Sequence, residues 1–217
     1  MTMRSSHTIT CRACGRQQEF VVWETLNATL NPELKQRLLA GDLNTFVCDG
    51  CGDEAEVVYS MLYHDMTQHF MVWLLAEGGE LPDLSTIGQL GGVIGESMRS
   101  YRLRTVGSRN ELVEKVLLFD SDFDDREMEL FKLALVETMR RSGKAVEGTL
   151  LFAGTSDPPE GRLIRFVLLH ETGRKALAVP WDEWDRVAPG LASLLPEPQA
   201  EAGKWLRVDE AYARALM

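Results

Sequence analysis

Short runs of apolar and β-branched residues separated by turn residues dominate the first third of the chain, and they indicate a β-rich unit. Glu19–Leu26 places Phe20 and Val22 on one face and Val21 and Trp23 on the other. Further strands are expected at Leu43–Val47, at Ala55–Tyr59 and at His69–Leu75.

One short helix of about ten residues interrupts these strands. Asn31 stands at the N-cap, Pro32 at the first helical position and Gly41 just after the end. The apolar stripe of this helix comprises Leu34, Leu38 and Leu39.

The second half of the chain mixes helices and strands. YRLRTVGS, residues 101–108, alternates like a strand, and a helix follows as NELVEKVLLF. Residues 125–141 carry apolar residues at spacings of three and four, which predicts a longer helix. The tail, residues 146–217, returns to three strands, expected as an antiparallel meander, and then to a helical pattern around Pro189 and a last helix capped by Asp209.

Residues 78–98 hold six glycines and one proline, a composition typical of a linker. The sequence therefore predicts an α+β protein in two parts. An N-terminal zinc ribbon-like antiparallel β unit with a helical insertion covers residues 1–80. A glycine-rich linker covers residues 81–98, and an α+β C-terminal domain covers residues 99–217.

The charge balance disfavours one class of partner. The 217 residues include 23 basic and 33 acidic side chains, for a net charge of −10. Residues 1–80 alone hold five basic and eleven acidic residues, a net of −6. Such a surface repels a phosphate backbone, so nucleic-acid binding is not expected. No secretory signal and no membrane-spanning apolar run is visible, which predicts a cytoplasmic protein with no membrane partner.

Two cysteine pairs carry the clearest chemical signal. Each pair has two intervening residues and is followed by a glycine, Gly15 or Gly52, that can adopt the positive φ of a tight turn. Two such turns can direct four thiolates at one ion, and a closed four-thiolate shell is typical of structural zinc. The predicted zinc ligands are Cys11, Cys14, Cys48 and Cys51.

Other uses of four cysteines stay open at this point. Two Cys-x-x-Cys redox couples are one, although each pair leads into a strand and not into the helix of a thioredoxin-like couple. An iron–sulfur centre and four unrelated buried thiols are the others. The repeated glycine and the expected reducing compartment favour the metal over these alternatives.

Residues 8–75 resemble the CpXC domain family of bacterial and archaeal proteins. The resemblance rests on both cysteine pairs, on TLNPELKQRLLAGDLNTFVC and on YSMLYHDM, and it continues less closely over residues 101–133. Members often carry proline after the first cysteine of each pair, where this chain has Arg12 and Asp49. The resemblance implies metal binding by the four cysteines, and it implies no activity, substrate or partner.

The histidines offer little catalytic promise. His64 and Asp65 are neighbours that can orient a general base, but a turn residue bonded to the backbone is the favoured interpretation. His170 ends a predicted strand and is expected in a turn. No nucleophile elbow and no phosphate-binding loop is present.

Two other clusters have simple structural interpretations. Asp120, Asp122 and Asp124 alternate like the first ligands of a calcium loop, but the glycine and the bidentate glutamate of that loop are absent, which favours a helix cap. Trp181 and Trp184 lie one turn apart and are expected to pack in a core or between domains.

These observations favour a non-enzymatic, zinc-stabilised module that binds a protein partner or itself. The alternative is a zinc ribbon that binds nucleic acid or serves transcription, which the acidic charge disfavours. An enzyme assembled from distant residues of the second part has no motif in its support.

Overall fold

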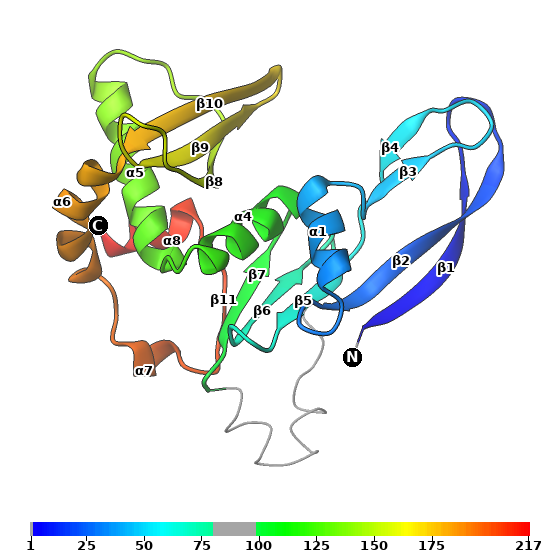
Figure 1. Ribbon diagram of the computed structural model, residues 1–217, viewed down its shortest axis with the longest axis horizontal. Helices are drawn as coiled ribbons and strands as arrows, with labels where there is room; N and C mark the ends of the chain where they lie inside the picture. The colour runs from blue at the N-terminus through cyan, green and yellow to red at the C-terminus, as the bar shows by residue number, and fades with distance from the viewer. Residues whose placement is uncertain (1, 80–98) are drawn as a thin grey trace. The chain divides into compact units, whose positions relative to one another are not determined.

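The computed structural model of the chain describes residues 2–79 and 99–217, so the predicted linker at 81–98 lies outside the described residues. The chain divides into two compact units, which Figure 1 colours from blue to red along the sequence. Unit 1 comprises Met1–Arg109 and Ala202–Trp205, and unit 2 comprises Asn110–Glu201 and Leu206–Met217. The mixture of helices and sheets agrees with the predicted α+β class.

A six-stranded sheet with the order β1-β2-β5-β6-β7-β11 forms the body of unit 1. Neighbouring pairs alternate between antiparallel (β1 with β2, β5 with β6) and parallel (β2 with β5, β6 with β7). The strands are β1 (Met3–Thr10), β2 (Gln17–Asn27), β5 (Met61–Asp65), β6 (Phe70–Leu74), β7 (Arg102–Val106) and β11 (Trp205–Leu206).

The connection from β2 to β5 carries the remaining elements of unit 1 (Figure 1). Helix α1 (Pro32–Ala40) begins with proline and ends at Gly41 in the left-handed conformation, as the sequence predicts. Asn31 stands at the N-cap but makes no side-chain cap bond. A separate hairpin of β3 (Thr45–Val47) and β4 (Glu54–Glu56) follows α1.

The core of unit 1 lies where the alternation of β5 and β6 meets α1. Every second residue of both strands is buried. From α1, Leu34 and Leu38 are buried, whereas Leu39 is only partly so. The sequence places the start of the second domain at residue 99, but β7 pairs with β6, so residues 99–109 belong to unit 1.

Unit 2 consists of helices and a three-stranded antiparallel meander, in the order β10-β9-β8, as predicted. An aromatic cluster fills its core, and Phe123 stacks edge-on against both Phe152 and Trp184, with ring centroids 5.4 and 5.2 Å apart. The elements are α4 (Arg109–Asp120), α5 (Asp125–Arg141), β8 (Thr149–Ser156), β9 (Leu163–His170), β10 (Gly173–Pro180), α6 (Trp181–Ala192), α7 (Pro198–Glu201) and α8 (Glu210–Leu216).

Local capping explains the ends of two helices in unit 2. The Asp124 carboxylate accepts the backbone N–H of Arg126 at the start of α5, and Asp209 accepts that of Tyr212 at the start of α8. Helix α6 continues through Pro189 to Ala192, beyond the interruption that the sequence predicts. Within the described part of the chain, no helix combines the length and the hydropathy that crossing a membrane requires.

Candidate metal centre

The four cysteines lie in two turns, one at the tip of each hairpin of unit 1. The first turn joins β1 to β2, and its Cys11 N–H donates to Arg16 O at 2.8 Å while Gly15 N–H donates to Cys11 O at 2.9 Å. Each turn therefore closes on its own first cysteine, and the following strand holds it in place.

The second turn, between β3 and β4, repeats this geometry. Cys48 N–H donates to Asp53 O at 2.9 Å, and Gly52 N–H donates to Cys48 O at 2.8 Å. The glycines have φ values of 75° at Gly15 and 74° at Gly52, a region that residues with a Cβ rarely adopt. The repeated glycine of the sequence thus has the turn-closing role that was predicted for it.

The two turns bring all four sulfur atoms together. Cys11 Sγ lies 3.7 Å from Cys51 Sγ, and Cys14 Sγ lies 3.6 Å from Cys48 Sγ. All four lie within 4.8 Å of one another. Cys11 and Cys48 are buried, whereas Cys14 and Cys51 are exposed. The described residues contain no other group of three or more side chains placed to hold a metal ion.

The electrostatics of the cluster favour a cation. The backbone N–H of Gly50 donates to Cys48 Sγ at 3.4 Å and is the main reason that the pKa of this thiol falls to about 7. The Asp53 backbone N–H lowers the pKa of Cys51, but Cys14, burial and the other sulfurs more than offset it and raise this pKa to about 12. Four adjacent sulfurs cannot all ionise without a counter-charge, and a metal ion supplies one.

A small apolar core supports the cluster from below. Phe46 is buried with Cys11 and Cys48, and Ile9, Phe20 and Val57 pack against this group. Above the second turn, the Arg16 side chain passes so close to Gly50 that a Cβ there would meet Arg16 Cδ at 2.8 Å. The sequence gives no sign of this Arg16 contact, because it joins the two turns across the hairpins.

His64 and Asp65 do not form a catalytic pair, because neighbours on a strand point to opposite faces. Asp65 is buried and accepts the backbone N–H groups of Thr67 and Gln68, which closes the β5–β6 turn. His64 lies with Nε2 3.3 Å from the Tyr101 hydroxyl, and burial lowers its pKa. The turn interpretation therefore holds for Asp65.

The remaining candidates also have structural roles. Asp124 caps α5, while Asp120 and Asp122 are exposed. Trp184 is buried in the core of unit 2, and the Arg162 guanidinium lies 3.5 Å from the ring centre of Trp181. His170 is exposed and bonds Thr172.

Comparison with known proteins places the chain in a family. Residues 9–132, more than half of the 217, match the model of the family described as CpXC protein. The chain belongs to the CpXC family. The matched region contains both cysteine turns, so the candidate metal centre lies within the family's own segment. No curated protein and no solved structure matches the chain.

Proposed function

We propose that this CpXC protein is a non-enzymatic module in which a structural zinc ion holds a protein-binding surface in place. The convergence of four sulfurs carries the proposal. Sulfurs at the corners of a tetrahedron with Zn–S bonds of about 2.3 Å lie about 3.8 Å apart. The closest pairs here, at 3.7 and 3.6 Å, fit that geometry.

A four-thiolate shell has no open position for water or substrate, so the zinc is assigned a structural role. The β3–β4 hairpin has few apolar residues of its own beyond Phe46. Bonds from one ion to both turns would fix this hairpin against the β1–β2 hairpin. The proposed function therefore depends on a surface that these two hairpins build together.

A groove of about 350 Å³ lies beside the metal centre and supplies such a surface. The end of β1 contributes Ile9 and Thr10 to its lining, and β4 and the residues after it contribute Ala55 and Val57. Val58, also in the lining, is 68% exposed, the second most exposed large apolar side chain among the described residues. An apolar side chain so exposed beside a groove is typical of a contact surface.

Free strand edges border this groove. β1 is the outer strand of the six-stranded sheet, and β4 has only β3 as a neighbour in the two-stranded sheet. Val57 N–H bonds Asn44 O, and bonded pairs alternate along an antiparallel ladder. The backbone groups of Glu54 and Glu56 therefore face away from β3. An extended segment of a partner can bond to these groups by β-strand addition.

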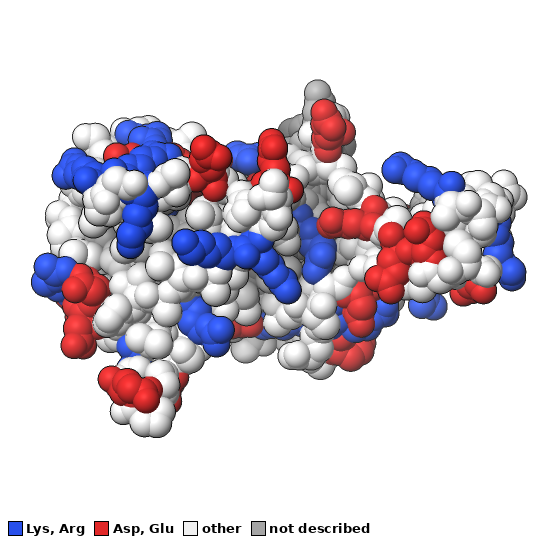
Figure 2. Space-filling model, turned by 90° about the horizontal axis from the view of Figure 1, so that it is seen from above, with Lys and Arg blue, Asp and Glu red and all other residues white. Residues whose placement is uncertain are grey.

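Charge identifies the kind of segment that fits. Asp53 and Glu56 line the groove against a single basic residue, Arg12. Figure 2 shows acidic side chains gathered over the part of unit 1 that carries β3 and β4. The proposed partner is therefore an extended protein segment with alternating apolar and basic residues.

Metal analysis of the purified, reduced protein tests the zinc. We expect one zinc per chain, and Cys48→Ser should lose it and unfold the β3–β4 hairpin, because three ligands cannot complete the shell. Asp49→Ser is the matched control, since Asp49 lies exposed in the same turn and is not a ligand. Less than half a zinc per chain in the wild type, or full retention in Cys48→Ser, would contradict the proposal.

Fluorescence anisotropy with labelled decapeptides tests the groove. The zinc-loaded chain should bind a peptide of alternating valine and lysine at least tenfold more tightly than one of alternating valine and glutamate. Glu56→Lys should remove this preference, whereas Glu24→Lys, exposed on β2, should retain it. Equal binding of both peptides, or no effect of Glu56→Lys, would refute the assigned partner and leave the zinc test unaffected.

A further inference from the structure

Unit 2 buries five charged side chains, which is unusual because burying a charge is costly unless it is paired. Each is at most 6% exposed. They come from two adjacent segments, α4 and the first two thirds of α5. The five residues are Glu114, Lys115, Asp125, Glu129 and Lys132.

Lys132 stands at the centre of this buried charge network. Its ammonium donates to Glu114 Oε1 at 2.8 Å and to Glu129 Oε1 at 2.7 Å. Lys115 lies 3.1 Å from Asp125 Oδ2 and donates to the carbonyl of Val208 at 2.7 Å. Both lysines are therefore held by carboxylates and backbone, and neither ammonium is available to a ligand.

The two glutamates differ from the lysines in this respect. Glu114 Oε1 also accepts the Phe152 backbone N–H at 2.6 Å, and the second contact of Glu129, with Lys115 at 3.7 Å, again uses Oε1. All these contacts end on Oε1. Within the described residues, Oε2 of each glutamate thus carries no hydrogen bond, and both residues line the same pocket. Two buried acceptor atoms remain for a donor that is not part of the chain.

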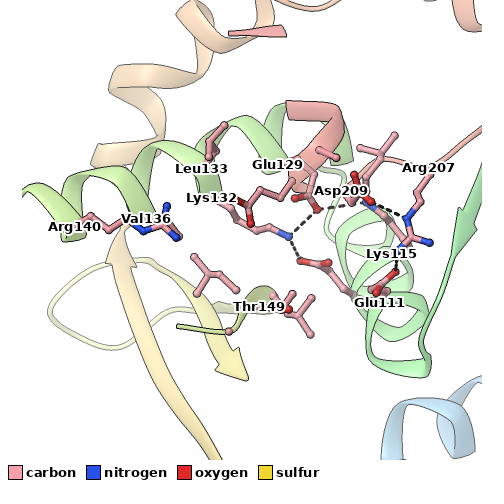
Figure 3. A pocket seen from close by; sticks show the side chains of 17 residues that line it. Glu111, Lys115, Glu129, Lys132, Leu133, Val136, Arg140, Thr149, Arg207 and Asp209 are labelled. Carbon is pink, nitrogen blue, oxygen red and sulfur yellow. Dashed lines mark hydrogen bonds and ion pairs between the residues drawn. The ribbon is translucent and has the colours of Figure 1, made fainter. Parts of the chain in front are cut away.

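That pocket has a volume of about 220 Å³. Figure 3 shows Lys132 reaching from α5 toward the two carboxylates, with Leu133 and Val136 on the same helix. Leu150 and Leu151, at the start of β8, complete an apolar wall. A short aliphatic chain can pack against this wall while its polar end reaches the acceptors.

The charge of the lining determines the sign of that polar end. Five acidic residues, Glu111, Glu114, Glu129, Asp209 and Glu210, oppose four basic ones, Lys115, Lys132, Arg140 and Arg207. At the rim, Arg207 is engaged by Asp209 at 2.7 Å and by Glu111 at 3.5 Å, as the dashed lines of Figure 3 show. The balance repels an anion and favours a single positive charge.

We propose that the pocket of unit 2 binds a small molecule through a primary ammonium group, which donates to Oε2 of Glu114 and of Glu129. An ammonium has three N–H donors and no acceptor, so it matches two open carboxylate oxygens. Its aliphatic stem lies along Leu133 and Val136. A metal ion fits less well, because the cysteines are the only metal-binding group among the described residues.

The protonation of Glu129 is consistent with this assignment. Burial, ahead of the opposing effect of Lys132, raises its pKa to about 7. The charged groups that face it are Lys132 on its own helix and Glu114 and Lys115 on α4. A bound cation would supply counter-charge to the ionised carboxylate and displace its proton.

Titration of n-butylammonium into the ¹⁵N-labelled, zinc-loaded full chain tests the proposal by NMR. Amide signals of residues 148–151 and 208–211 should shift saturably. n-Butanol and butyrate, of similar size, should bind at least tenfold more weakly. No saturation up to 100 mM, or equal binding of n-butanol or butyrate, would overturn the proposal.

A variant and a pH series give independent readouts. Glu129→Gln keeps the size of the side chain and should weaken n-butylammonium binding at least tenfold. Glu127→Gln, on the same helix but outside the pocket, should not. In the wild type, affinity should rise about tenfold from pH 6 to pH 8 as Glu129 ionises. If Glu129→Gln does not fold, a flat pH profile in the wild type would by itself overturn the role of Glu129.

Discussion

At the scale of single residues, the metal centre depends on backbone conformation as much as on cysteine. Gly15 and Gly52 adopt nearly equal positive φ values, and an added Cβ at either would meet no atom within 4 Å. Steric clash is therefore absent at both positions, and only the left-handed backbone selects glycine.

This separation predicts the effect of substituting Gly52. Gly52→Ala should cost roughly 1–2 kcal/mol of stability in the zinc-loaded state, whereas Gly52→Asn should cost less, because asparagine tolerates the left-handed region. Competition with a zinc chelator and thermal unfolding measure the effect. Gly190→Ala, in open space within α6, is the control and should not destabilise the protein. Equal effects of alanine and asparagine at Gly52 would contradict the conformational explanation.

A second residue-scale prediction concerns pH. The pKa of Glu129 is raised from 4.5 to about 7 in the folded state, so the folded state binds more protons than the unfolded state between these values. The free energy of unfolding of unit 2 should therefore fall as pH rises from about 4.5 to 7, by up to roughly 3 kcal/mol. The raised pKa of Lys132 acts only above pH 10 and does not enter this range.

Urea unfolding followed by the NMR signals of β8–β10 measures this slope. Glu129→Gln cannot titrate, so its unfolding free energy should vary less over the same range than that of the wild type. Glu127→Gln is again the matched control. Parallel slopes for Glu129→Gln and the wild type would show that other groups carry the pH dependence.

At the scale of elements, the sequence predicts those whose signals are local. Helix α5 has the predicted bounds because apolar periodicity, the Asp124 cap and Gly143 all agree. By contrast, β1 has almost no apolar residues and forms because it pairs with β2 over its whole length. β5 was expected to be a turn, but its pairing with both β2 and β6 makes it a strand. Long-range pairing overrides local propensity in both cases.

The two candidate sites differ in the same way. The metal centre is predictable because cysteine spacing and the following glycine are local signals. The buried charge network is not, because Glu114 and Lys115 on α4 look like a solvated helix face in the sequence. Their burial depends on contacts with Phe152 and Val208, which are distant along the chain.

The cap of α5 gives an element-scale prediction. Asp124 accepts the Arg126 N–H at 2.9 Å and also pairs with the Arg126 guanidinium. Asp124→Ala should lower the free energy of unfolding of unit 2 by about 1–2 kcal/mol, whereas Asp124→Asn keeps the cap acceptor and should cost less than half of that. Urea unfolding compares the two variants. If asparagine costs as much as alanine, the ion pair and not the cap stabilises this helix end.

At the scale of the whole molecule, the two units are stabilised by different means. Unit 2 has an aromatic core around Phe123, Phe152 and Trp184. The β3–β4 hairpin of unit 1 has only a small apolar cluster, which includes two of the cysteines themselves. Metal removal should therefore act on a part of unit 1 and spare unit 2.

Hydrogen–deuterium exchange with and without a zinc chelator tests this separation. Chelation should abolish amide protection in residues 9–18 and 45–56, because the ion holds the two turns together. Protection in β5 and β6 should persist in part, since every second residue of these strands is buried in an apolar core. Protection in residues 149–180 should not change. Loss of protection across the meander would mean that unit 2 depends on the metal centre, and unchanged protection in residues 45–56 would mean that the metal does not stabilise the hairpin.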